Sequence, residues 1–200
     1  GLLSGLLQEG YAMGNLLAAL AFRTVYPWAT VHFPGNAWRI MFFLGGLPAL
    51  LSLFIRMRVK ESEAWHEHRT DWATYRAILK RNARRFFYLV LLMTMMNFMS
   101  HGTQDMYPTL LRTFGYDKKH IADITMLSMF GAVLGGLAFG HYSDRSGRRR
   151  SMIVAASCGL VVLPMWIAGF SPLSTIAGVF LMQFFVQGAW GVIPAHINEL

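Results

Sequence analysis

Charge and cysteine are both scarce in this sequence. Only 14% of the 200 residues are charged, and Cys158 is the single cysteine, whereas about 25% of the residues in an average soluble domain are charged. One cysteine excludes an internal disulfide framework, so Cys158 is expected to be a small packing residue. Hydrophobic residues make up 54% of the chain. One water-soluble core cannot hide that much apolar surface, whereas lipid accepts it from every side. The composition therefore favours a membrane protein.

Long stretches of the chain carry neither a charge nor a histidine, at 86–100, 124–140 and 151–195. A membrane-spanning helix takes about 20 mostly apolar residues, so the longest stretch is expected to hold two spans with a turn at 169–172. The predicted fold class is all-α, a polytopic transmembrane helix bundle. The first span is expected to end at Pro27. Six spans are predicted, at about 6–26, 38–55, 86–111, 121–142, 151–169 and 173–196.

The basic residues are concentrated in two short segments. The net charge is +8, and most of the 18 lysines and arginines lie in 56–85 and 145–150. Cytoplasmic loops show this distribution under the positive-inside rule. We therefore expect both segments in the cytoplasm and no nucleic-acid partner. The basic residues elsewhere are Arg23, Arg39, Arg112, Lys118 and Lys119.

The first basic segment has helical periodicity over 62–79. Ser62 is a candidate N-cap. The apolar residues on one side of this helix are Trp65, Trp72, Tyr75 and Leu79. The pattern predicts an amphipathic helix at the membrane surface, which is either a linker between two bundles or a regulatory element. His66 and His68 lack further ligands, so no metal site is predicted.

The second basic segment contains an ordered motif, G-x-x-x-D-R-x-G-R-R, between the fourth and fifth spans. Its defining residues are Gly140, Asp144, Arg145, Gly147, Arg148 and Arg149. Gly147 is expected to make a tight turn, and Asp144 to pair with an arginine or a helix end. Such a pairing can act as a latch that holds two helices together in one conformation. The alternative is a basic anchor at the cytoplasmic face.

This loop resembles the signature loop of the major facilitator superfamily, which follows the second and eighth of twelve helices. The resemblance implies that the chain covers helices five to ten, the middle portion of a longer transporter. It implies three parts: 1–55 as the last two helices of the N-terminal half, 56–85 as the cytoplasmic linker, and 86–200 as the first four helices of the C-terminal half. It also implies that helices five and eight pack across the boundary between the halves. Small-residue pairs predict close packing, namely Gly10 with Gly14, Gly131 with Gly135, and Gly136 with Gly140.

A polar stripe interrupts the third span. Asn97, His101, Gln104 and Asp105 are spaced i, i+4, i+7 and i+8, which predicts one helix face, flanked by Ser100 and Thr94. Ionisable groups inside a membrane usually face a water-filled cavity or each other. The stripe therefore predicts a transport pathway. Taken singly, Asp105 is equally a cap at the membrane surface and His101 a hydrogen-bonded packing residue.

The stripe also resembles a pattern of lactate and pyruvate permeases in the sialate:proton symporter group, N-x-x-S/T-H-x-S/T-Q-D-x-x-x-T. The matching residues are Asn97, Ser100, His101, Thr103, Gln104, Asp105 and Thr109. The resemblance implies proton-coupled symport of a monocarboxylate such as lactate or pyruvate. It also implies a multi-pass protein of the plasma (inner) membrane, without cofactor or metal. A monomer is expected.

Roles for individual residues follow as hypotheses. His101 is the candidate for proton coupling with Asp105 as its partner, and Asn97 and Gln104 are candidate hydrogen-bond donors to the substrate. Gln183 and Gln187 either line the same cavity or form simple interhelical bonds. Arg23 is a candidate partner for a substrate carboxylate, or a side chain that snorkels to the surface. Alternative functions are transport of sialic acid or another organic acid, sugar or drug exchange, a channel, or an intramembrane enzyme.

Overall fold

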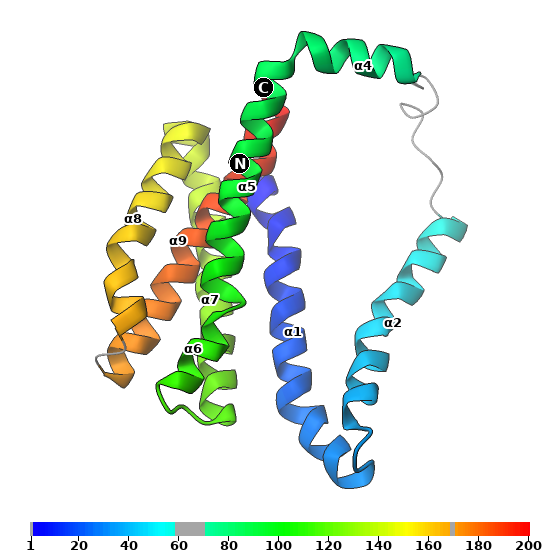
Figure 1. The fold of residues 1–200 in the computed structure, drawn as a ribbon, viewed down its shortest axis with the longest axis vertical. Helices are drawn as coiled ribbons and strands as arrows, with labels where there is room; N and C mark the ends of the chain where they lie inside the picture. Colours follow the sequence, from blue (N-terminus) through cyan, green and yellow to red (C-terminus); the bar gives the residue numbers. More distant parts are fainter. Residues whose placement is uncertain (1, 59–70, 169–170) are drawn as a thin grey trace. The chain divides into compact units, whose positions relative to one another are not determined.

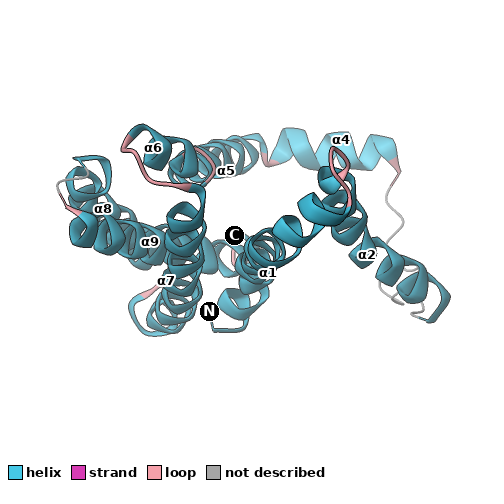
Figure 2. Cartoon of the chain, turned by 90° about the horizontal axis from the view of Figure 1, so that it is seen from below, coloured by secondary structure: helices cyan, strands magenta, loops and turns pink. Residues whose placement is uncertain are grey.

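The computed structural model describes residues 2–58, 71–168 and 171–200. Within these ranges the regular structure is helical and no strand is present (Figure 2). The predicted all-α class is therefore confirmed. The helices, in chain order (Figure 1), are α1 (Leu2–His32), α2 (Ala37–Arg58), α4 (Trp72–Arg81), α5 (Ala83–Gln104), α6 (Tyr107–Thr113), α7 (Lys118–Ser146), α8 (Arg148–Ala168) and α9 (Pro172–Asn198).

Four helices in the described ranges are long and apolar enough to cross a membrane: α2, α7, α8 and α9. They coincide with four of the six predicted spans. The other two predicted spans correspond to α1 and to α5 together with α6, which do not reach the same measure of length and apolar composition. Both regions carry polar side chains within the helix, such as Arg23 in α1 and His101 in α5.

The predicted end of the first span at Pro27 is wrong. α1 continues through Pro27 to His32. A proline removes one backbone donor, but membrane helices tolerate it where local groups satisfy the freed carbonyls. The carbonyl that Pro27 leaves without its usual donor is that of Arg23, four positions earlier, and α1 is continuous across it. The chain turns only afterwards, at Gly35, whose φ of 80° suits glycine.

The third predicted span, 86–111, is broken in the structure. α5 ends at Gln104, and α6 begins at Tyr107 with Pro108 in its first turn. A continuous helix would need a hydrogen bond from residue 108 to the carbonyl of Gln104, and proline has no N–H to make it. In the first turn of a new helix the missing donor costs nothing. Asp105 therefore lies just beyond the end of α5.

Side-chain caps fix where the helices α4, α7 and α9 begin. Asp71 is in an extended conformation, accepts a hydrogen bond from Thr74 N at 3.1 Å and begins α4. The prediction of one continuous helix over 62–79 is therefore wrong at Asp71, and the helix that begins at Trp72 continues to Arg81. The predicted cap Ser62, together with Trp65, His66 and His68, lies outside the described residues, as do Gly169 and Phe170 of the predicted turn. Asp117 caps α7, and Ser171 and Ser174 form a capping box at α9.

The chain divides into two compact units, Gly1–Arg23 with Leu92–Leu200, and Thr24–Leu91. In the first unit α7, α8 and α9 lie side by side (Figure 1). Their apolar core forms two clusters, one around Leu111, Met182 and Val186 and the other around Ala155, Ala189 and Val192. Tyr107 of α6 stacks on Trp166 of α8 with ring centroids 4.7 Å apart. α6 is therefore fastened to α8.

Close backbone approach occurs at some of the predicted glycines and not at others. A Cβ at Gly135 would lie 1.9 Å from the carbonyl oxygen of Phe184, and one at Gly131 would lie 2.5 Å from that of Phe180. The predicted packing at this pair is confirmed, and its partner is α9. At Gly10 and Gly14 none of the described residues lies within 4 Å of a Cβ, so the described helices do not make the close contact predicted for this pair.

The contact between α1 and α7 is made by a different glycine. A Cβ at Gly5 would lie 2.6 Å from the carbonyl oxygen of Gly136. The first span and the fourth therefore touch, as the resemblance implied for helices five and eight. The contact lies five residues before Gly10 and nine before Gly14.

Candidate functional site

His101 and Asp105 form a contact on the open face of α5. The ring Nδ1 of His101 lies 2.7 Å from Oδ2 of Asp105, and the two side chains are 54% and 55% exposed. The end of α5 at Gln104 leaves the i, i+4 relation intact, because Asp105 N still bonds to the carbonyl of His101 at 3.0 Å. The pair therefore holds a titratable ring and a carboxylate within reach of solvent.

The predicted polar stripe separates into two groups in the structure. Thr94, Asn97, His101 and Asp105 are exposed, whereas Ser100 is buried. Asn97 donates to the carbonyl of Met93 on its own helix at 2.8 Å, so its amide is partly occupied by the backbone. We call the exposed residues Thr94, Asn97, His101 and Asp105 the open stripe.

Gln104 is half-buried and bonds to α9, so it is not part of the open stripe. Its side chain accepts a hydrogen bond from Gln187 Nε2 of α9 at 3.3 Å, and Gln183 Nε2 donates to the carbonyl of Thr103 at 3.4 Å. Gln183 and Gln187 are buried, and Gln183 Oε1 has no partner among the described residues. Gln104 lies at the edge of the predicted stripe, where α9 offers it an amide, so it is half-buried whereas Asn97, His101 and Asp105 are exposed. Gln183 and Gln187 thus both form interhelical hydrogen bonds in the structure.

Arg23 of α1 forms an ion pair with Asp123 of α7. The pair joins positions 100 residues apart, and the two side chains are 41% and 39% exposed. Sequence reasoning missed Asp123, because a single acid near the start of a span looks like an end-of-helix residue. The signal available was its charge, which lies two residues inside the predicted fourth span.

The start of α7 carries a separate His–Asp pair outside the membrane-spanning part of the chain. The backbone N–H and the ring of His120 bond to the carboxylate of Asp117, and the backbone hydrogen bond contributes most to lowering the pKa of Asp117. These side chains are 70% and 62% exposed. The pair caps the helix and provides a useful comparison for His101 and Asp105.

The loop motif is built around one arginine. Gly147 links α7 to α8 with φ 91°, a conformation that side chains rarely adopt. Arg148 donates from Nη1 to Asp144 Oδ1 at 2.6 Å and to Ser143 Oγ at 2.8 Å, and from Nε to Glu199 Oε1 at 3.0 Å. Arg148 thus ties the end of α7 to the end of α9. Glu199 was not singled out in the sequence, because it stands 51 residues away from Arg148.

The other motif residues make fewer contacts. Gly140 is buried at the packed end of α7, and Asp144 also accepts a hydrogen bond from Leu2 N of α1 at 3.1 Å. Arg145 and Arg149 are exposed, and the ion pairs found in residues 2–58, 71–168 and 171–200 do not include them. The motif therefore contains one arginine built into the fold and two that face outward.

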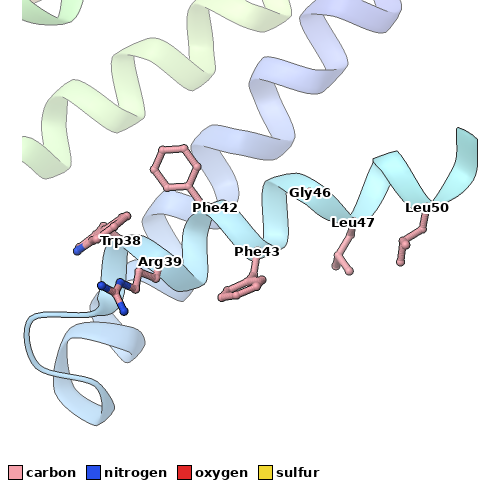
Figure 3. Close-up of a pocket in the computed structure, with 7 residues that line it drawn as sticks. All are labelled: Trp38, Arg39, Phe42, Phe43, Gly46, Leu47 and Leu50. Atoms are coloured by element: carbon pink, nitrogen blue, oxygen red, sulfur yellow. The ribbon is translucent and has the colours of Figure 1, made fainter.

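An apolar hollow on α2 offers different chemistry. It encloses about 540 Å³ and is lined by Trp38, Arg39, Phe42, Phe43, Gly46, Leu47 and Leu50. Figure 3 shows Phe43, Leu47 and Leu50 on the same side of the helix. Arg39 is the charged member, and its guanidinium carbon lies 5.2 Å from the centre of the Trp38 ring. The lining suits lipid or another helix better than a polar solute.

Among the described residues there is also no group of three histidines, cysteines or acids placed to hold a metal ion.

Comparison with known proteins adds the family. The sequence profile described as Major Facilitator Superfamily matches residues 1–200. The carboxylic acid transporter protein homolog of Saccharomyces cerevisiae is 26% identical over 225 residues, which cover 99% of this chain and 36% of that protein. The sialic acid transporter NanX of Escherichia coli is 26% identical, covering 98% of this chain and 48% of that protein.

A third relative is the cis,cis-muconate transport protein of Acinetobacter baylyi, 23% identical over 98% of this chain and 48% of that protein. The chain thus spans about half, or less, of the length of these relatives. No solved structure matches the chain. The helical architecture and the family profile over the whole sequence lead to one conclusion: the chain belongs to the Major Facilitator Superfamily.

Proposed function

We propose that the protein is a secondary active transporter that moves a small organic acid together with a proton across the plasma (inner) membrane. The observation that carries this proposal is the contact between His101 Nδ1 and Asp105 Oδ2 at 2.7 Å on the open stripe. Histidine changes charge near neutral pH. A hydrogen bond to an adjacent carboxylate fixes the orientation of the ring. The pair is thus suited to load a proton on one side of the membrane and release it on the other.

Neutral hydrogen-bonding groups stand on either side of this pair. Asn97 precedes it by one turn, and Gln104, bonded to Gln187, lies directly beside it. Amides can exchange their mutual hydrogen bonds for bonds to a substrate carboxylate or hydroxyl. In a membrane such exchange costs about 1 kcal/mol for each interhelical bond. We assign Asn97, Gln104 and Gln187 to the substrate pathway, with Ser100 as a buried support.

The topology we propose follows the charge distribution. The basic segments 56–85 and 145–150 face the cytoplasm, and 56–85 joins two helical halves, with 1–55 in the first and 86–200 in the second. In a transporter of this kind access alternates by movement of one half against the other around a site near the middle of the membrane. The transporter acts as a monomer.

The hydrogen bonds of Arg148 support a role in that movement. Its guanidinium contacts Asp144 and Glu199 at once, so α7 and α9 are tied at one end. We assign Gly140, Asp144, Gly147 and Arg148 to a conformational latch. Arg145 and Arg149 are assigned to the basic anchor at the membrane surface, because they are exposed.

Two substrate classes remain in competition. The seven-residue pattern from Asn97 to Thr109 favours a monocarboxylate such as lactate or pyruvate. The names of the relatives, which refer to carboxylic acid, sialic acid and cis,cis-muconate, support a second candidate, a larger organic acid. Both classes present at least one carboxylate and suit the same amide groups.

The test is uptake by the full-length protein in cells that lack their own carboxylate permeases. Labelled lactate, pyruvate, cis,cis-muconate and sialic acid are offered with an imposed inward proton gradient and with the gradient collapsed. Gradient-dependent uptake of one acid supports the proposal and identifies the class. We expect His101→Ala to abolish the dependence on the gradient. His120→Ala is the matched control, because His120 is also an exposed partner of an aspartate, outside the open stripe. Uptake that ignores the gradient in the unmodified protein argues for a channel.

A further inference from the structure

The ion pair between Arg23 and Asp123 has no part in the function proposed above. It joins α1 to α7 across 100 positions of the sequence. By contrast, the pairs His101–Asp105, Asp117–His120 and Asp144–Arg148 each lie within four positions along the chain. A contact of this range exists only because two helices are packed together.

Both charges lie within long helices and not in loops. Asp123 is five residues after Lys118, the first residue of α7, or about 8 Å along the helix axis. Arg23 is nine residues before His32, the last residue of α1, or about 14 Å. Charged side chains at such positions in membrane proteins are costly and mark substrate or ion pathways unless they serve only each other.

The ion pair between Arg23 and Asp123 is partly exposed, and the Arg23 guanidinium uses only some of its hydrogen-bond donors in it. Arg23 and Asp123 are 41% and 39% exposed, so neither charge is enclosed by the packed helices. Among the described residues, the contact to Asp123 engages Nη1 of Arg23 and one carboxylate oxygen. A guanidinium has five N–H donors in a planar fork that matches a carboxylate with two parallel bonds. A substrate carboxylate that makes two parallel bonds to Arg23 can therefore displace Asp123, which makes one.

Arg23 differs from the other charged groups near the start of α7, because it forms its ion pair with another helix. Asp117 and His120 bond to each other. The charged residues of α8 and the end of α9 gather at the opposite end of α7, where Arg148 meets Glu199. The other nearby cations, Arg112 and Lys119, are not among the ion pairs in the part of the chain that the structure describes.

We propose that Arg23 is the carboxylate-binding group of this transporter and that Asp123 is the internal anion that occupies it in the absence of substrate. The inference rests on the proposed function, because it assumes an organic acid as substrate. Binding exchanges one ion pair for another, with the substrate carboxylate taking the place of Asp123 on the guanidinium, and no covalent bond changes. Asp123 thereby keeps an unliganded arginine from standing unpaired in the membrane and sets the affinity for the substrate. The competing role for the pair is a plain structural bridge between α1 and α7.

Concentration-dependent uptake of the transported acid tests the inference in the full-length protein. We expect Asp123→Asn to lower KM by about fivefold, because the competing anion is gone. Arg23→Gln should lower kcat/KM on the order of 30-fold. Arg23→Lys should recover part of that loss, because the charge remains without the fork. Arg112→Gln and Asp117→Asn are the matched controls and should leave KM unchanged.

The double variant Arg23→Gln with Asp123→Asn separates binding from bridging. The double variant removes both charges, so neither is left without a partner. The protein can therefore fold although the ion pair between α1 and α7 is gone. We expect the double variant to unfold at a temperature close to that of the unmodified protein and to transport no better than Arg23→Gln alone. Uptake restored in the double variant, or an unchanged KM in Asp123→Asn, overturns the inference and leaves the proposed function standing. Absence of uptake of every acid by the unmodified protein overturns both.

Discussion

α2 and α9 are both long and apolar enough to cross a membrane, yet they differ in what they bury. α9 packs on α7 and α8 and buries residues along its whole length, including Gly178, Gln183 and Val192. In the described residues α2 buries only Ala37, and its phenylalanines and leucines are exposed. Apolar composition therefore places a helix in the bilayer without saying which helices it contacts.

The difference lies in small and polar residues at helix contacts. α7 meets α9 through glycines that allow backbones to touch, and α5 meets α9 through amides. Lipid tails are as apolar as leucine, so burial of leucine drives little association in a membrane, whereas close packing and hydrogen bonds do. Four experiments sharpen this comparison.

The largest effect is expected at Gly135. The change Gly135→Leu puts a side chain where a Cβ alone would lie 1.9 Å from the carbonyl oxygen of Phe184. We expect a loss of about 3 kcal/mol or more in folding stability, because α7 and α9 must separate. Thermal unfolding of the detergent-purified protein measures it. Gly46→Leu on α2 is the control, since nothing lies within 4 Å of its Cβ position, and equal losses in the two variants would remove the distinction between the helices.

The next effect is expected at the latch. Arg148→Gln removes hydrogen bonds to Asp144 and Glu199 from a side chain that is only 17% exposed. We expect a loss of about 2 kcal/mol in stability, because two carboxylates lose their charged partner. The same change at the exposed Arg149 should have no measurable effect on the unfolding midpoint. If Arg149→Gln lowered the stability more than Arg148→Gln, the assignment of Arg148 to the latch and of Arg149 to the basic anchor would be wrong.

A smaller effect is expected at the amides. Gln187→Leu deprives Gln104 of its donor at 3.3 Å, and we expect a loss of about 1 kcal/mol, as for other hydrogen bonds between membrane helices. Asn97→Leu provides the comparison, because Asn97 bonds only within α5 among the contacts described for it. The unfolding midpoint should fall for Gln187→Leu and stay nearly constant for Asn97→Leu. The reverse order would mean that α5 and α9 are held together by apolar packing alone.

The smallest effect is expected on α2. Leu47 is 55% exposed, so Leu47→Ala should change the stability by no more than about 0.5 kcal/mol. The same thermal unfolding measurement applies, with Val186→Ala in α9 as the contrasting variant, because Val186 is 1% exposed. A large loss in Leu47→Ala would show that α2 has a packing partner in the folded protein.

Local features of the fold were predictable where local chemistry decides them. The charge-free stretches predicted the helical segments that became α7, α8 and α9, and Gly147 was expected at the turn that joins α7 to α8. The two prolines show the limit. Pro27 does not end α1, whereas Pro108 breaks the third span at Asp105 and Met106. Whether a proline interrupts a membrane helix depends on how the freed backbone groups are satisfied, which the sequence does not state.

The sequence by itself determined that the chain is helical, apolar enough for a bilayer, and polar along part of α5. It also placed His101 and Asp105 one turn apart, so their contact needs no tertiary fold. Only the tertiary structure decided which polar groups meet across helices, namely Arg23 with Asp123, Gln104 with Gln187, and Arg148 with Glu199. These partners stand between 51 and 100 residues apart, and helices of similar composition can pack in many registers. The glycine contacts of α7 are compatible with few of those registers, because they require the backbones themselves to touch.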